Sequence, residues 1–145
     1  MKFKIERVKK KHFNEVIEII VKNISKFIPK KKNHKIIWKN FSSQKNLYAI
    51  VVLLEQKVVG YGSIFFAKKI RGGTIGYIED IVVDKKFQFK GLGKKIVKEL
   101  TAFGKKKKCY KIILQCVKKR NIKFYRKNKY DPNGYVLQKN FIIKN

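Results

Sequence analysis

Residues 75–95 read IGYIEDIVVDKKFQFKGLGKK, and the architecture of the chain is best understood outward from them. The apolar run Ile75–Val83 predicts a strand, and the apolar spacing within Gly91–Lys105 predicts an amphipathic helix whose Ile96 and Leu100 face a sheet. A short charged loop and a glycine-spaced turn join the two. A strand, a glycine-rich turn and a helix in this order are typical of a site for an anionic ligand.

The turn Gln88–Gly93 has the pattern Gln-x-x-Gly-x-Gly. Its two glycines leave little side chain in the way, so backbone N–H groups can approach an oxygen-rich ligand. The helix that follows directs the positive end of its dipole toward the same place. We therefore expect this turn to bind a pyrophosphate group.

Glu79 and Asp80 interrupt the apolar strand and are two of only nine acidic residues. An unpaired carboxylate inside such a strand would be costly to bury. Adjacent strand residues point to opposite faces, so both side chains cannot face the core. Either one carboxylate pairs with a nearby Lys, or the two serve a polar site.

The length of 145 residues and a hydrophobic content of 44% indicate one globular domain, residues 1–145. No apolar run approaches the roughly 20 residues that span a bilayer. The first residues, MKFKIERVKKKHF, lack the apolar centre of a signal peptide. We expect a cytoplasmic protein without a membrane span.

The formal net charge is +29, and such an excess of Lys is typical of nucleic-acid-binding proteins. Only four of the 38 basic residues are Arg, however, and the Lys residues are spread over nearly every segment. Sequence-specific readers of nucleic acids rely on Arg and stacked aromatic side chains. We therefore do not expect nucleic acid as the main partner, and the charge instead favours small anionic ligands.

Cys109 and Cys116 are separated by a segment that we expect to be a strand. Seven residues at about 3.3 Å each hold the two thiols too far apart for a disulfide. The chain has no CxxC pair and no clustered His, so we expect no metal site. His12 and His34 are isolated and are predicted to lie at the surface or to cap helices.

The periodicity of the remaining residues predicts further elements in chain order. The expected strands and helices are a strand at 3–8, helices at 12–26 and 36–41, a hairpin of strands at 46–54 and 57–67, a buried strand at 109–116, a helix at 121–128 and a last strand at 135–144. We expect the flat patch at Gly60 and Gly62 to serve close packing rather than to seat a ligand, and Trp38 to lie in the core rather than to contact the substrate.

These motifs together resemble the GCN5-related N-acetyltransferase (GNAT) superfamily, and within it most closely the glucosamine 6-phosphate N-acetyltransferases. The resemblance rests on Gln88–Gly93, Gly76–Val83, Gly91–Lys94, Cys109–Ile112, and Asn121 with Phe124, Tyr125 and Tyr130. It covers the C-terminal half in the right order. It implies an α/β (α+β) fold, in which helices flank a central mixed, mostly antiparallel sheet.

The resemblance implies acetyl transfer from acetyl-CoA to the amine of glucosamine 6-phosphate, by direct attack in a ternary complex and on the route to UDP-N-acetylglucosamine. It also implies a homodimer. Tyr125 is implied at the thioester as the catalytic acid, with Asp80 and Glu79 at the amine. The N–H of a residue after Asp80, Val82 for example, is expected to stabilise the oxyanion.

Two sets of binding residues follow from the same resemblance. The implied cofactor-binding residues are Ile81, Val82, Val83, Gln88, Phe89, Lys90, Gly91, Leu92, Gly93, Lys94, Asn121, Phe124, Tyr125, Arg126 and Lys127. The implied substrate-binding residues are Lys69, Glu79, Asp80, Ile81, Tyr110, Lys111 and Lys139.

The chain departs from the family pattern at Gln115, where members often carry an acid that could help to deprotonate the amine. Asn140 stands where a basic residue is expected to reach the phosphate across a dimer interface.

Cys116 as an acyl carrier is a distant second mechanism. Two other functions stay open, namely acetylation of another small amine or a protein N-terminus, and a basic nucleic-acid-associated module that retains the fold.

Overall fold

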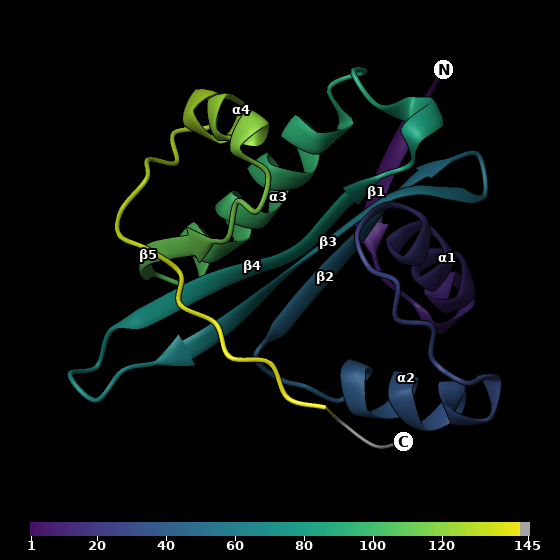
Figure 1. The fold of residues 1–145 in the computed structure, drawn as a ribbon, viewed down its shortest axis with the longest axis horizontal. Coiled ribbons are helices and arrows are strands. Elements are labelled where there is room, and N and C mark those ends of the chain that lie inside the picture. The colour runs from purple at the N-terminus through teal and green to yellow at the C-terminus, as the bar shows by residue number, and fades with distance from the viewer. Residues whose placement is uncertain (143–145) are drawn as a thin grey trace. The chain divides into compact units, whose positions relative to one another are not determined.

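The computed structural model describes residues 1–142 and divides into two compact units, Met1–Leu114 and Gln115–Asn145. Each unit is described by itself. Helices flank a sheet in the first unit, and a short helix with extended chain makes up the second (Figure 1). In the described residues no helix has the length and apolar character to cross a membrane.

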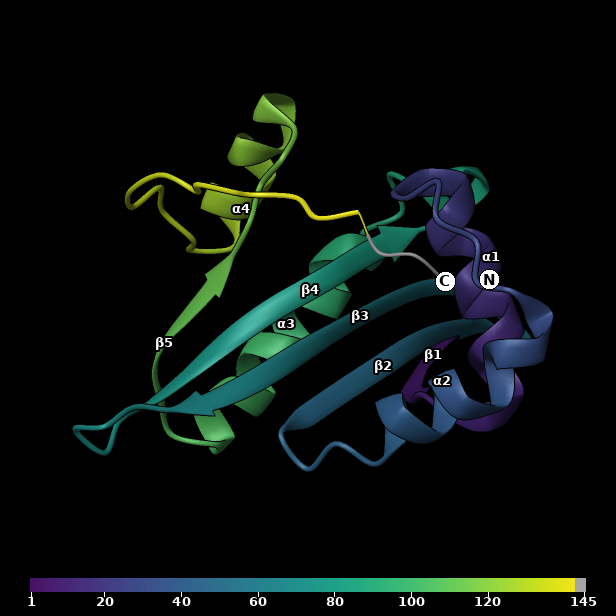
Figure 2. The same cartoon turned by 60° about the horizontal axis from the view of Figure 1, so that its bottom comes forward.

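Five strands form one sheet in the order β1 to β5, as Figure 2 shows. Their bounds are Phe3–Arg7, Leu47–Leu54, Lys57–Lys68, Thr74–Val83 and Cys109–Leu114. Neighbouring strands are antiparallel except β4 and β5, which are parallel and joined through helix α3 (Leu92–Lys106). The sheet is thus mixed and mostly antiparallel, as predicted.

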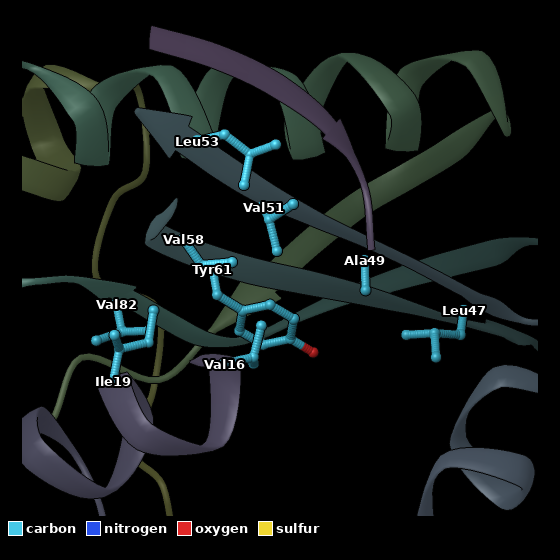
Figure 3. Packing of buried hydrophobic residues seen from close by; sticks show 9 residues of the cluster. All are labelled: Val16, Ile19, Leu47, Ala49, Val51, Leu53, Val58, Tyr61 and Val82. Atoms are coloured by element: carbon cyan, nitrogen blue, oxygen red, sulfur yellow. The ribbon is translucent and has the colours of Figure 1, made fainter. Parts of the chain in front are cut away.

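Helices cover both faces of the sheet. α1 (Phe13–Asn23) and α2 (His34–Ser42) pack on one face and α3 packs on the other (Figures 1 and 2). Val16 and Ile19 of α1 join Tyr61 of β3 and Val82 of β4 in a buried cluster, which Figure 3 shows. Burying a side chain of this kind stabilises the fold by about 1.5–3 kcal/mol relative to leaving it exposed.

The close approach of α3 depends on two glycines of β3, as predicted. A Cβ atom added at Gly62 would lie 2.6 Å from Ile96 Cγ2 and 3.1 Å from Leu100 Cδ1. At Gly60 the nearest atoms would be Ile96 Cδ1 at 3.2 Å and Val52 Cβ at 3.3 Å. The missing side chains therefore make room for the buried stripe of α3.

His12 is 2% exposed, so the surface prediction for it was wrong, whereas the capping prediction is confirmed. Its Nδ1 accepts a hydrogen bond from the Lys9 N–H at 3.1 Å, at the turn before α1. Its Nε2 lies 3.3 Å from Glu6 Oε1. Burial lowers the pKa of His12, so the neutral ring is the favoured form.

Two predicted strands differ from the structure. β5 ends at Leu114, two residues before the predicted end at Cys116. It was predicted to be buried, but its residues are half-buried or exposed, because β5 is an edge strand of the sheet. Residues 135–142 form no strand, since no neighbouring strand pairs with them in the described chain, and the rest of that predicted strand lies outside the described residues. The helix predicted at 121–128 is present as α4 (Ile122–Lys127).

Candidate active site

The centre of the candidate site is a β-bulge in β4. Ser63 pairs with Glu79 and Tyr61 pairs with Val82, so β4 holds one more residue than β3 between these two pairs. Asp80 absorbs the extra length with a left-handed backbone, at φ +54°. Left-handed backbone is rare outside glycine, and its strain is often found at functional sites.

The bulge presents two carboxylates to solvent. The Glu79 and Asp80 side chains are both exposed, and within residues 1–142 neither forms an ion pair or a side-chain hydrogen bond, so the predicted alternative of a Lys partner is absent there. Desolvation raises the pKa of Asp80. Desolvation, and secondly the charge of Asp80, raise the pKa of Glu79. Two coupled carboxylates without partners are suited to take up a proton.

An open strand edge begins beside these carboxylates. β4 pairs with β5 only from Thr74 to Ile78, which is matched with Leu114, so within residues 1–142 no strand pairs with β4 on that side from Glu79 onward. A slot between two splayed strands can accept an extended ligand as an added strand.

The direction of the backbone N–H groups along this edge follows from the ladder with β3. The Asp84 N–H donates to the Val59 carbonyl at 2.9 Å, and Val82 lies two residues before Asp84 in the same register. Because hydrogen-bonded pairs alternate along an antiparallel ladder, the Val82 N–H also faces β3. By the same alternation the Val83 N–H faces the open edge, whereas Ile81 lies inside the bulge, where the ladder is interrupted. On this register Val83, with Ile81 of the bulge, is a better candidate for the oxyanion donor than the predicted Val82.

The predicted anion loop precedes α3 as expected. Phe89 and Gly91 both have left-handed backbone, at φ +61° and +75°, and Gln88 is anchored by its Nε2, which donates to the Val83 carbonyl at 3.2 Å. Gly91 is the N-cap of α3 and offers no capping side chain, so the first N–H groups of the helix lack an internal acceptor.

Space remains in front of this loop. A Cβ atom at Gly91 would meet no atom within 4 Å, and Lys90 and Lys94 are exposed on either side. Leu92 is buried and fixes the start of the helix to the sheet, while Gly93 follows in its first turn. The loop thus fits a phosphate-bearing ligand by its N–H groups, its charge and its free volume.

Three predicted substrate residues lie at the opposite end of β4. Lys69 belongs to the turn between β3 and β4, where its N–H donates to the Gly73 carbonyl at 2.7 Å. The exposed Tyr110 of β5 packs its ring over Gly73, whose added Cβ would lie 2.7 Å from Tyr110 Cε1. Lys111 places its Nζ 5.6 Å from the centre of the Tyr110 ring. These residues form one basic and aromatic cluster, distinct from the bulge.

The remaining predicted site residues belong to the second unit. The Tyr125 ring is half-buried and lies 5.0 Å from the Phe124 ring, edge to face. Burial, and secondly Cys116, raise the pKa of Tyr125, which keeps its hydroxyl protonated. Asn121 occupies the N-cap position of α4 without a side-chain cap bond, and Arg126 and Lys127 are exposed in the last turn.

Gln115 and Cys116 follow β5 directly. The Cys116 thiol lies 3.2 Å from the Lys118 carbonyl, and both cysteines are free thiols, as predicted. Lys139 lies outside any strand, with its Nζ 5.7 Å from the Phe141 ring centre. No group of three or more potential metal ligands occurs among the described residues.

Trp38, which was predicted to lie in the core, is half-buried. Its ring centre lies 5.8 Å from that of Phe13 and 6.1 Å from that of Phe41. With Arg7 it lines a cavity of about 50 Å³. Such a cavity admits water but no sugar, so Trp38 acts here in packing. A larger open groove of about 590 Å³ lies along α1 and includes Ile17, Val21 and Ile28.

Two residues next to the bulge escaped the sequence prediction. Ser63 and Tyr61 of β3 are both buried, and the Ser63 hydroxyl donates to the Glu79 carbonyl at 3.1 Å. The only sequence signal is a serine within an apolar strand, which by itself does not reveal its partner across the sheet.

Comparison with known proteins identifies relatives of this chain. The chain is 39% identical over 99 residues to glucosamine 6-phosphate N-acetyltransferase 1 from Dictyostelium discoideum, covering 65% of this chain and 62% of the relative. It is 35% identical over 105 residues to the Candida albicans glucosamine 6-phosphate N-acetyltransferase, covering 70% of each. Part of each relative's length is therefore unmatched.

A solved structure and a family model are similar to this chain over most of its length. The crystal structure of glucosamine-6-phosphate N-acetyltransferase from Arabidopsis thaliana superposes with a TM-score of 0.88 and 28% identity, covering 98% of this chain and 100% of that one. The sequence model of the acetyltransferase (GNAT) family matches residues 13–130, which include β4, the anion loop and α4. The chain belongs to the GNAT acetyltransferase family.

Proposed function

We propose that this protein transfers the acetyl group of acetyl-CoA to the amine of glucosamine 6-phosphate, giving N-acetylglucosamine 6-phosphate. The observation that carries the proposal is the bulge in β4, which presents two carboxylates without partners in the described chain, on the strand that leads to the proposed anion loop. The names of the relatives supply the acceptor, since the proteins from Dictyostelium discoideum and Candida albicans are both glucosamine 6-phosphate N-acetyltransferases.

Acetyl-CoA supplies the activated acetyl group, and the residues of the first unit fit its two ends. The N–H groups at the start of α3, with Lys90 and Lys94, would bind the pyrophosphate. The open edge of β4 would hold the pantetheine arm, whose amides can pair with a strand. The N–H groups of Ile81 or Val83 would then stabilise the oxyanion.

Proton transfer needs a base at the amine and an acid at the sulfur. Asp80 and Glu79 are the proposed bases, because a raised pKa increases the affinity of a carboxylate for the proton of the amine. Tyr125 is the proposed acid, because its raised pKa keeps the proton on the hydroxyl until the thiolate leaves. With Gln115 unable to act as a base, amine activation falls to these two carboxylates or to a water held by backbone carbonyls.

Recognition of the sugar phosphate is proposed for the cluster at the other end of β4. Lys69 and Lys111 supply positive charge, Tyr110 supplies a ring face, and Lys139 is a further proposed contact. The net charge of +29 favours an anionic acceptor over a polyamine or a Lys-rich protein tail.

A homodimer is part of the proposal, as are a cytoplasmic location and a role in UDP-N-acetylglucosamine synthesis. The dimer is supported by the segment 135–142, in which Tyr135, Leu137 and Phe141 are 99%, 94% and 76% exposed. Apolar side chains in such a row are typical of an interface. Light scattering should give twice the chain mass of 17.2 kDa, and a monomer would contradict this part.

The test of the proposed reaction is release of coenzyme A from acetyl-CoA in the presence of different amines. Glucosamine 6-phosphate should be strongly preferred over unphosphorylated glucosamine, a polyamine and a Lys peptide at equal concentration. Preference for another amine would remove the sugar phosphate from the proposal, and no release with any amine would refute the reaction.

A further inference from the structure

The two faces of β4 and β5 can be assigned from the packing of α3. A Cβ atom added at Gly76 would lie 3.3 Å from Ile112 Cγ1, and one added at Gly104 of α3 would lie 2.5 Å from Ile112 Cδ1. Gly76 and Ile112 therefore both face α3. Because successive strand residues point to opposite faces, Tyr77 of β4 and Ile113 of β5 face the other side, which carries α1 and α2.

Tyr77 is the middle of an apolar row across three strands, made of Phe65, Tyr77 and Ile113. Tyr77 is matched with Phe65 of β3 on one side and with Ile113 of β5 on the other. Side chains at matched positions lie next to one another on the same face of a sheet. Phe65 and Tyr77 are half-buried and Ile113 is 40% exposed, so part of this apolar row is accessible to solvent.

Charged side chains lie on either side of the apolar row. Glu79 follows Tyr77 by two residues, so it lies on the same face, and it is exposed. Lys111 is matched with Ile75, two residues before Tyr77, and is exposed on this face as well. At about 3.3 Å per residue, Ile75 and Glu79 are about 13 Å apart along the strand. Tyr77 thus lies midway between a proposed base and a proposed phosphate contact.

The proposed acceptor carries its groups in the same order. Glucosamine 6-phosphate has its amine on carbon 2 and its phosphate-bearing carbon on carbon 5, directly across the sugar ring. The ring substituents are equatorial in this sugar, so C–H groups make up both faces of the ring. Apolar and aromatic side chains predominate where proteins bind small molecules, and a C–H face can pack on them. A sugar with its amine at Glu79 and its phosphate near Lys111 would lie over Tyr77.

We propose that Tyr77 is a substrate-binding residue, whose ring lies under the sugar ring of glucosamine 6-phosphate, with Ile113 beside it. The inference rests on the proposed function and deepens it, because it names the contact to the part of the acceptor that holds neither the amine nor the phosphate. The charged residues recognise the two ends of the acceptor, and Tyr77 selects for a sugar ring between them.

Tyr77→Leu tests the contact by kinetics. Leu keeps an apolar side chain beside Phe65 but removes the flat ring, so the KM for glucosamine 6-phosphate should rise roughly 10-fold. The kcat and the KM for acetyl-CoA should stay within about twofold of the parent, because the ring binds the ground state and the transition state equally. Tyr77→Phe keeps the ring and should keep the parent KM. An unchanged KM in Tyr77→Leu, or an equal rise in Tyr77→Phe, would refute the ring contact.

Two acceptors separate the ring contact from phosphate recognition. Glucosamine 6-phosphate and unphosphorylated glucosamine share the sugar ring, so Tyr77→Leu should lower kcat/KM by a similar factor for both. Lys111→Met removes a positive charge and should lower kcat/KM for the phosphorylated sugar alone. If the loss in Tyr77→Leu is also confined to the phosphorylated sugar, Tyr77 acts on the phosphate cluster and the ring contact is refuted.

Binding of the acceptor gives a readout that does not depend on turnover. In the presence of coenzyme A, the calorimetric Kd for glucosamine 6-phosphate should rise in Tyr77→Leu by the same factor as the KM. Saturation-transfer NMR on the parent should give its strongest signals at the C–H protons of the sugar ring, and these should weaken in Tyr77→Leu. Equal Kd values for the parent and Tyr77→Leu would contradict the proposal.

Tyr48→Leu is the matched control. Tyr48 of β2 is also a half-buried tyrosine of the sheet, but its ring stacks on Phe103 of α3 with a distance of 3.7 Å between ring centres. The substitution should lower the free energy of unfolding and leave the KM for glucosamine 6-phosphate unchanged. If Tyr48→Leu raises this KM as much as Tyr77→Leu does, the effect is general destabilisation and the ring contact is refuted.

Ile113→Asp decides the question if Tyr77→Leu does not fold. Ile113 is exposed on an edge strand, so the fold should tolerate the change. A carboxylate beside Tyr77 should raise the KM for glucosamine 6-phosphate several-fold, because it replaces an apolar contact and repels the phosphate. An unchanged KM would show that the sugar does not lie over the apolar row.

Failure of the ring contact can be distinguished from failure of the proposed function. If the parent acetylates glucosamine 6-phosphate and Tyr77→Leu has the parent KM and Kd, only the ring contact is refuted. If the parent prefers an amine without a sugar ring, the proposed acceptor is wrong and the ring contact is refuted with it.

Discussion

Asp80 combines two unfavourable features at one residue. Its backbone is left-handed, which for a residue other than glycine is disfavoured by about 1–2 kcal/mol, and its exposed carboxylate has a pKa raised by partial desolvation and no counter-ion in the described chain. Neither feature helps the strand to form. Both fit the proposed role of Asp80 as a proton acceptor at the attacking amine, beside an open strand edge.

Asp80→Asn should lower turnover by roughly 10²-fold or more if Asp80 is the base. It should also lower the pKa of Glu79, because the repulsion between the two carboxylates is removed and only desolvation remains. Glu79 would then ionise at a lower pH, and any residual activity should persist to lower pH. NMR titration of the Glu79 carboxyl carbon measures this shift, and an unchanged Glu79 pKa would show that the two groups are not coupled.

Gly91→Ala tests the anion loop. At φ +75° a Cβ strains the backbone, and it also enters the space where a phosphate is proposed to bind. Loss of one charge-assisted hydrogen bond, about 1.5–3 kcal/mol, should raise the KM for acetyl-CoA roughly 10-fold or more.

Gly72→Ala is the control for Gly91→Ala, since Gly72 has φ +91° and equally open surroundings in the turn between β3 and β4. Both substitutions should lower the free energy of unfolding by about 1 kcal/mol. Only Gly91→Ala should change the KM for acetyl-CoA. Equal KM values for the two variants would remove the loop from the cofactor site.

At the scale of elements, the contact between α3 and β3 depends on two glycines of β3. Gly62→Ala places a methyl group 2.6 Å from Ile96 and should destabilise the protein by about 1–3 kcal/mol, as overpacking does. Gly60→Ala meets its nearest atom only at 3.2 Å and should be milder. Urea unfolding measures both, and a larger loss at Gly60 would contradict this packing.

Most elements could be predicted from sequence because their patterns are local. The spacing of Val16 and Ile20 marks α1, and two β-rich runs around Glu55 mark the hairpin of β2 and β3. The burial of β5 could not be predicted, since an apolar run looks the same in a central and in an edge strand. The segment 135–142 has the composition of a strand, but pairing depends on a neighbour that the local pattern does not reveal.

Candidate site residues could be identified from the sequence only where they contrast with their surroundings. Glu79 and Asp80 are acidic within an apolar strand, and Gly91 and Gly93 recur at a spacing that a helix start explains. Ser63 and Tyr61 meet Glu79 and Val82 through the register of β3 against β4, and the bulge between these two pairs has no local signal. The direction of the Val82 N–H likewise follows from pairing alone.

For the whole molecule, the charge of +29 should govern how fast anionic substrates arrive. Raising the salt concentration from about 0.05 M to about 0.3 M shortens the distance over which this charge acts. The kcat/KM for acetyl-CoA and for glucosamine 6-phosphate should fall several-fold, since electrostatic steering is screened. Unphosphorylated glucosamine serves as the control acceptor and should not lose kcat/KM in the same way. Equal salt dependence for both acceptors would show that the charge does not steer the sugar phosphate.

The left-handed backbone at Asp80 also has an evolutionary consequence. Glycine adopts this conformation freely, so a gene library sorted only for resistance to heat should accumulate Asp80→Gly. A library sorted for growth that requires the acetylated sugar should retain aspartate at the same codon. The two selections would therefore favour different residues at position 80, and the residue found there would indicate which selection the lineage has faced.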